Sequence, residues 1–166
     1  GATLGADKVV TVESPALAHA VADSTVAALQ AAAEAAGANT VVFAATTKGK
    51  DFAPRLAAAM DAAIASDVTG INDDGTLERP MYAGNVFATV ELSGATKIFS
   101  VRTTAFDAAE AGAAAPIEAV SADITAGGIT WVGKEETKSD RPVLTEADRV
   151  VSGGRGLKNG ENFKTV

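Results

Sequence analysis

The chain has 166 residues, enough for one hydrophobic core, and 14 Lys or Arg against 21 Asp or Glu give it a formal net charge of −7. Because nucleic acids and anionic membranes are themselves negatively charged, this balance argues against binding to either. The sequence contains no cysteine, which excludes disulfides, thiol catalysis and iron–sulfur ligation, and it has no apolar run of about 18 residues that would predict membrane insertion.

The chain begins with a segment typical of a buried strand, followed by a helix. Residues 8–12 are short, apolar and β-branched, as in a parallel strand covered on both faces. Ser14 as N-cap and Pro15 at the first helical position predict a helix that starts there and continues to residue 36. Gly37 is expected to end this helix in the left-handed conformation.

A second strand and helix follow in the same order. Residues 40–45 predict the strand, and the loop at 46–51 leads into a helix through residue 65, with Pro54 in its first turn. Residues 68–71 predict a further short strand. The alternation of strand and helix indicates a parallel sheet with right-handed crossovers.

The middle of the chain has the character of an antiparallel sheet. Residues 72–75 predict a turn, and three strands follow closely at 77–83, 86–92 and 97–102. Residues 93–95 predict a tight hairpin between the last two of these strands. The expected fold class is therefore α/β, a mostly parallel sheet flanked by helices with an added antiparallel strand section.

Two late strands and a linker are predicted next. The strands fall at 116–121 and 129–134, and the charged stretch 134–149, which contains Pro142, is typical of a linker. We expect a domain boundary at its end, dividing the chain into residues 1–147 and 148–166.

The last segment has a pattern typical of phosphate binding. An apolar run at 149–151 predicts a buried strand, a glycine-rich turn at 152–156 contains Arg155, and 159–163 predict the start of a helix. Glycines let the backbone approach a ligand, a helix start presents free N–H groups, and arginine adds a bidentate charge. A surface arginine in a turn is the alternative interpretation of Arg155.

Four stretches, in order along nearly the whole chain, resemble the α subunit of electron-transfer flavoprotein. Their residues are 43–51 with 54–57, then 66–68, then 82–85 with 99–106, and finally 138–144 followed by the glycine-rich turn. The last stretch is the most specific of the four.

The resemblance implies an N-terminal α/β domain followed by a C-terminal domain that binds FAD. Residues 1–147 would be most of the first domain, whose initial strand and helix are expected to precede Gly1, and 148–166 the start of the second. Arg155 matches an arginine that contacts FAD, and most of the FAD site would lie outside this chain. The partner implied is a β subunit, and the pair would carry electrons from acyl-CoA and similar dehydrogenases to a quinone oxidoreductase.

No catalytic residue and no metal ligand is expected, since neither a Ser–His–Asp set nor paired catalytic carboxylates stand out. The resemblance thus implies an electron carrier without substrate turnover of its own. An acidic, alanine-rich chain of this kind is expected in the bacterial cytoplasm.

Several other residues have simple structural interpretations. The loop at 46–50 lacks Walker spacing, and a structural role is expected for it. His19 is expected on the solvated face of the first helix. Asp73 and Asp74 are expected to stabilise the turn in which they lie. Tyr82, Gly84 and Asn85 would line a cleft or simply join two strands. Arg102 and Phe106 would face a partner or pack on their own sheet.

Two other functions remain open at this point. One is a stand-alone adenine-nucleotide-binding α/β module, based on the strand, loop and helix around residues 46–51. The other is a structural domain that binds only a partner chain.

Overall fold

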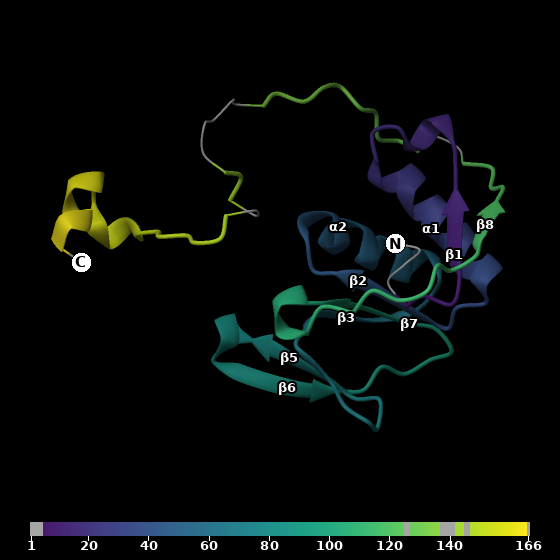
Figure 1. The fold of residues 1–166 in the computed structure, drawn as a ribbon, viewed down its shortest axis with the longest axis horizontal. Coiled ribbons are helices and arrows are strands. Elements are labelled where there is room, and N and C mark those ends of the chain that lie inside the picture. The colour runs from purple at the N-terminus through teal and green to yellow at the C-terminus, as the bar shows by residue number, and fades with distance from the viewer. Residues whose placement is uncertain (1–4, 125–126, 137–141, 145–146, 166) are drawn as a thin grey trace. The chain divides into compact units, whose positions relative to one another are not determined.

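The structure is a computed structural model that describes residues 5–124, 127–136, 142–144 and 147–165. The chain divides into two units, residues 1–131 and 132–166, and each is described by itself. The first unit contains every strand and both α-helices found in the described residues (Figure 1). It confirms the predicted α/β class. The domain boundary predicted between residues 147 and 148 stays a prediction.

A three-stranded parallel sheet is the centre of the first unit. Its order is β2 (Thr40–Ala44), β7 (Lys97–Val101) and β3 (Ala63–Val68), so the last strand along the chain lies in the middle. A separate parallel pair joins β1 (Val9–Val12) to β8 (Ile117–Val120), with Val9 opposite Ile117. Both pairings need long crossovers, as the βαβ pattern predicted.

An antiparallel sheet of three strands adjoins the parallel one. Its order is β4 (Gly70–Ile71), β5 (Leu77–Met81) and β6 (Val86–Val90). The turn predicted at 72–75 is confirmed, with Gly75 N donating to Asn72 O at 2.9 Å and Gly75 at φ 83°. Figure 1 shows β5 and β6 beside the sheet face opposite the helices.

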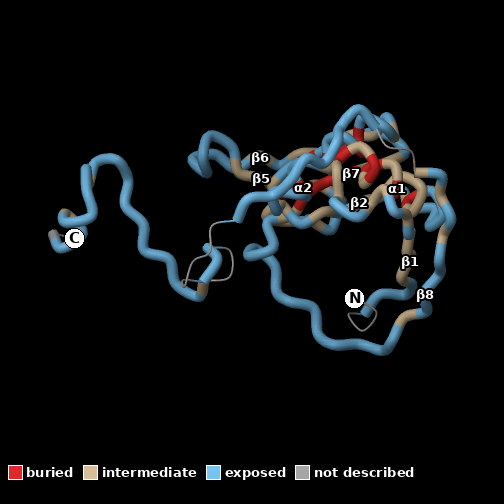
Figure 2. The backbone as a smooth tube through the Cα atoms, turned by 90° about the horizontal axis from the view of Figure 1, so that it is seen from above, coloured by how far each residue is buried: buried red, intermediate tan, exposed pale blue. Residues whose placement is uncertain are grey.

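Two apolar clusters cover the two faces of β7, which accounts for its central position. Ile98 packs with Val26 of α1 (Ala22–Ala36) and Leu56 of α2 (Thr47–Ala59), and Ile98 and Leu56 have 0% exposure. Phe99, the next residue, points to the other face and packs with Val68 and with Leu77 of β5. Buried residues accordingly gather along β7 and its neighbouring helices (Figure 2). Each fully buried side chain of this size contributes about 1.5–3 kcal/mol of burial free energy.

The first helix starts later than the sequence predicts. Ser14 does act as a cap, its Oγ accepting from Ala16 N at 3.3 Å, but it caps only the 3-10 turn Pro15–Leu17. Ala20 then takes φ 48°, which interrupts the helix, and α1 begins at Ala22. The C-terminal end is confirmed, because Gly37 takes φ 62° and its N–H donates to Ala33 O and Glu34 O.

The second helix ends earlier than predicted. Thr46 caps it through Oγ1, which accepts from Gly49 N at 3.2 Å. Pro54 lies inside the helix rather than in its first turn, so the expectation for this residue was wrong. The helix stops at Ala59, since the alanine-rich residues that follow enter β3 at Ala63.

Other boundaries also differ from the prediction. The hairpin expected at 93–95 is wrong, because β6 pairs with β5 while β7 returns to the parallel sheet between β2 and β3. The strand at 116–121 is confirmed as β8, whereas residues 129–134 form no strand. Of the motif at 138–144, residues 138–141 lie outside the described residues.

Candidate functional site

The glycine-rich segment around Arg155 folds as two short 3-10 helices, Arg155–Leu157 and Gly160–Thr165. Leu157 N donates to Gly154 O at 3.0 Å, and Lys158 N donates to Arg155 O at 3.1 Å, so the turn closes through its own backbone. The helix predicted within 159–163 is therefore present in 3-10 form. The strand predicted at 149–151 is wrong, because a strand needs a pairing neighbour and the described part of this unit contains none.

Gly153 is the glycine that the local packing requires. A Cβ on this residue would overlap Leu157 Cδ1 and lie 2.6 Å from Phe163 Cζ. Gly154 and Gly156, in contrast, face open space. The segment thus keeps its shape by packing two apolar side chains over the Gly153 backbone, which leaves the following turn exposed.

Two cations border the exposed side of this turn. Arg155 and Lys158 line a hollow of about 260 Å³ together with the glycine backbone and Asn159. Arginine offers a planar fork of donors to phosphate oxygens, and lysine adds a point charge. These residues fit one phosphate or diphosphate group, and the hollow is too small for a whole dinucleotide.

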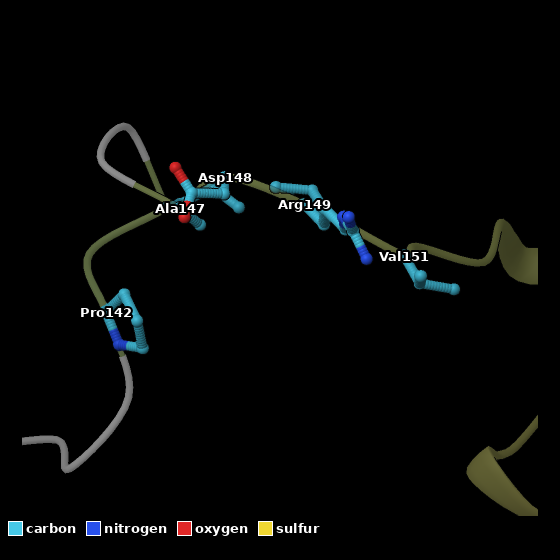
Figure 3. A pocket seen from close by; sticks show the side chains of 7 residues that line it. Pro142, Ala147, Asp148, Arg149 and Val151 are labelled. Atoms are coloured by element: carbon cyan, nitrogen blue, oxygen red, sulfur yellow. The ribbon is translucent and has the colours of Figure 1, made fainter.

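A second hollow, of about 790 Å³, is lined by residues 142, 144 and 147–151 of the same unit. Figure 3 shows Asp148, Arg149 and Val151 strung along one extended stretch rather than gathered around a centre. All three side chains are exposed. This hollow therefore brings no set of polar groups to a common point.

In the first unit, Asp67 and Arg102 form the most strongly held ion pair at the carboxyl ends of β3 and β7. Arg102 Nε donates to Asp67 Oδ1 at 3.2 Å, and Nη2 donates to Oδ2 at 2.5 Å. These hydrogen bonds with the Arg102 guanidinium are the main reason why the pKa of Asp67 lies below its ordinary value. Arg102 was expected to face a partner or its own sheet, and the structure gives it an ion-pair role.

Within the loop at 46–50, Gly49 has a structural role. A Cβ on Gly49 would overlap Ala44 O, so only glycine lets the first turn of α2 lie this close to the end of β2. Lys50, one residue further on, borders a cavity of about 500 Å³ together with Ser66 and Arg79. Arg79 is a site residue that no sequence signal points to, because it follows Glu78 in a strand with two charged residues.

The remaining candidates take structural positions. His19 lies in the turn before α1, not on the helix as predicted, and its ring stacks on Trp131 with centroids 4.8 Å apart. Asp74 accepts from Thr76 N at 2.9 Å, as turn chemistry predicts. Tyr82 is 76% exposed in the 3-10 turn Tyr82–Gly84, which joins β5 to β6. Phe106, at 38% exposure, ends the short turn Thr103–Ala105.

Within the described ranges, no three His, Cys, Asp or Glu side chains gather in a way that would hold a metal ion. The helices of that same part of the chain are all too short or too polar to cross a bilayer.

The fold and the site define an α/β protein in which a helix-covered parallel sheet is followed along the chain by a glycine-rich, cationic segment suited to phosphate. A family model described as "Electron transfer flavoprotein domain" matches residues 2–125. The chain therefore belongs to the electron transfer flavoprotein family.

Its named relatives are alpha subunits, which confirms the resemblance drawn from the sequence. The "Electron transfer flavoprotein subunit alpha" of Pseudomonas aeruginosa is 50% identical over 127 residues, covering 76% of this chain and 41% of the relative. That of Paracoccus denitrificans is 41% identical over 162 residues, covering 98% and 52%. The mitochondrial alpha subunit of Dictyostelium discoideum is 41% identical over 176 residues, covering 98% and 50%. The chain thus spans about half the length of these relatives.

Proposed function

We propose that this chain is part of the alpha subunit of an FAD-dependent electron carrier. One observation supports this most strongly. The match to the Paracoccus denitrificans alpha subunit covers 98% of the chain, so it must include the glycine-rich segment and Arg155 as well as the α/β domain. In this proposal FAD supplies the redox chemistry, and the protein supplies binding, electrostatics and docking.

Arg155 is the residue that we assign to FAD. With Lys158 it adds two positive charges to the lining of a small hollow that also includes Gly153 and Gly154. A diphosphate placed there would accept charge-assisted hydrogen bonds from the guanidinium. The rest of the cofactor needs residues outside this chain, because the hollow measures only about 260 Å³.

The partner in this proposal is a β subunit, and the first unit offers a surface for it. At the end of the antiparallel sheet, four apolar side chains are exposed, and we call this end of β5 and β6, with both of its faces, the hairpin surface: Met81, Tyr82, Val86 and Phe87. Exposed aromatic residues of this kind are enriched at protein interfaces. The donors would be acyl-CoA and related dehydrogenases, the acceptor a quinone oxidoreductase, and the location the bacterial cytoplasm.

The test is to read the coding frame on both sides of this chain and to purify the complete subunit with its β subunit. Flavin absorbance, followed by identification of the released cofactor, measures FAD content. We expect FAD in the complex and about tenfold weaker binding in Arg155→Gln, since a hydrogen bond to a charged group contributes about 1.5–3 kcal/mol. Arg149→Gln, an exposed arginine in the same unit, is the matched control and should retain FAD. A complete complex without flavin would overturn the proposal.

In that event the stand-alone adenine-nucleotide module becomes the better function. Its support is the position of the 46–50 loop at the end of a parallel strand, where open α/β sheets commonly bind ligands. It predicts that AMP or ATP binds and protects residues 46–51, and not Arg155, from hydrogen exchange. The structural partner-binding domain predicts a complex with no small ligand at all.

A further inference from the structure

The cavity beside α2 is lined by groups that neither the FAD proposal nor the core explains. It measures about 500 Å³ and lies at the carboxyl ends of β3 and β7, between the first turns of α2 and strand β5. This volume is within the range of small-molecule sites, about 300–1,000 Å³. Its wall combines an apolar surface with a small number of charged and hydroxyl groups.

The charges around the cavity are mainly positive, although the whole chain carries −7. Lys50 extends from α2 and Arg79 from β5, and both line the space. The carboxylate on the wall, Asp67, is already engaged by Arg102 through two hydrogen bonds. The ion pair leaves Lys50 and Arg79 as an excess of positive charge, which favours an anionic ligand.

Arg79 has donor capacity that the described residues do not use. Its Nη2 donates to Ser66 Oγ at 3.0 Å, whereas its Nε is shielded from solvent and has no acceptor within the described part of the chain. A shielded donor without a partner is unfavourable, so native structures rarely leave one unexplained. Because the shielded Nε is closed to a ligand oxygen as it is to water, a ligand in the cavity would instead accept from the terminal nitrogens of this guanidinium.

The backbone at the cavity is distorted in a way that brings polar groups to it. A register irregularity between Ala65 and Val68 interrupts the pairing of β3 with β7, and Asp67 takes φ 59°. Asp67 N donates to Ser100 Oγ at 3.0 Å, and Ser100 is 2% exposed. Bulges and left-handed non-glycine residues are costly and cluster at binding sites, where they aim side chains.

We infer that this cavity binds a small phosphate monoester. The phosphate contacts Lys50 and Arg79, and the organic part lies against the apolar wall formed by Pro54, Ile64 and Pro80. Arginine and lysine together suit a tetrahedral dianion, and the apolar wall favours an ester over inorganic phosphate. This inference is independent of the proposed FAD role, because it uses residues of the first unit only.

The probe is phenyl phosphate, titrated by calorimetry into the complete native protein, with inorganic phosphate and phenol as the two partial ligands. We expect phenyl phosphate to bind more tightly than either. Hydrogen exchange should slow in peptides that cover 47–55 and 64–68. A dissociation constant for phenyl phosphate weaker than about 1 mM would overturn the inference.

Two variants locate the phosphate. Lys50→Gln should weaken binding about tenfold, the loss expected for one charge-assisted contact. Lys48→Gln, an exposed lysine two residues earlier on the same helix turn, should leave the affinity unchanged. Arg79→Lys keeps the charge but loses the fork, and should give an intermediate loss. Equal effects of the two lysine variants would mean that general charge, and not this cavity, attracts the ligand.

The same samples separate this inference from the FAD proposal. FAD content measured alongside should not change in Lys50→Gln. Protection of 47–55 and 64–68 by the partner subunit alone, with no effect of phenyl phosphate, would show that the cavity is a protein contact and would overturn the ligand assignment.

Discussion

At the scale of single residues, the Asp67–Arg102 pair makes stability depend on pH. The pKa of Asp67 is lowered from 3.8 in the folded protein, mainly by the hydrogen bonds from Arg102. The pair therefore stabilises the fold fully above pH about 4, and this contribution is lost as the pH falls through the lower folded-state pKa. Asp67→Asn should flatten the acid side of the stability curve and cost less than about 1 kcal/mol at neutral pH, since the pair is partly exposed.

Urea midpoints measured between pH 2 and pH 7, values chosen to span the carboxylate range of about 3–5, would check this. Asp51→Asn is the matched control, because the Asp51 carboxylate is exposed and accepts one hydrogen bond from Arg55 Nε at 3.1 Å. An acid dependence that is the same in Asp67→Asn and the unsubstituted protein would contradict the assignment.

Gly49 allows a close contact between two backbone segments. Because a Cβ there would overlap the carbonyl oxygen of Ala44, Gly49→Ala must push α2 away from β2. We expect destabilisation of about 3 kcal/mol, the upper range for forced overpacking. Thermal unfolding measures it, with Gly156→Ala as control because that glycine faces open space. A melting temperature unaffected by Gly49→Ala would show that the helix end can move freely.

At the scale of elements, α2 contains an internal proline that weakens it. Pro54 lacks the N–H that would donate to Lys50 O, so Pro54→Ala restores one helical hydrogen bond. We expect stabilisation of about 1 kcal/mol, less than the full helical penalty because proline also restricts the unfolded chain. Pro15→Ala is the control, since Pro15 starts a 3-10 turn and should bring no gain. Helix content by circular dichroism and the denaturant midpoint would report both changes, and an equal response of the two variants would contradict the argument.

Elements were predictable where a local signal determines them. Gly37 carries its own signal for a helix end, and it ends α1 in the structure as expected. Thr46 caps α2, although the sequence placed it in a loop that continued to residue 51. The residues from Met60 to Ala65 carry no such signal, because alanine suits a helix and a buried strand position alike. Tertiary pairing with β7 decides that they enter a strand.

Long-range pairing also explains the other errors. The sequence between β6 and β7 is compatible with a hairpin. Ile98 and Phe99 of β7, however, are apolar and point to opposite faces, and both faces are covered only when β7 lies in the centre of a sheet. The same limit applies to the sites. Arg155 stands in a recognisable glycine motif, whereas Arg79 reaches the cavity only because β5 folds back beside the end of β3. No spacing of residues along the chain indicates that Arg79 and the end of β3 lie side by side.

At the scale of the whole molecule, the hairpin surface should determine how the chain associates with the β subunit that we propose as its partner. Pro80 lies opposite Phe87, and Met81 lies opposite Val86, so the apolar residues form cross-strand pairs at one end of the antiparallel sheet. These pairs add apolar area that the first unit does not itself cover, since Phe87 is 64% exposed and Tyr82 is 76% exposed. Water contact with such aromatic residues is unfavourable, and a partner chain would remove it.

Phe87→Lys tests this surface without disturbing the core, because the side chain is already largely in solvent. A charge placed in a desolvated interface centre should weaken association with the β subunit by at least about 2 kcal/mol, roughly thirtyfold. Ile117→Lys in β8 is the matched control, with a native side chain that is 67% exposed and a place outside the antiparallel sheet. Sedimentation of the complex at several concentrations measures both variants, and circular dichroism checks that each is folded. Equal dissociation constants for the two would place the β subunit on another face, whereas selective loss in Phe87→Lys would locate the interface at the end of β5 and β6.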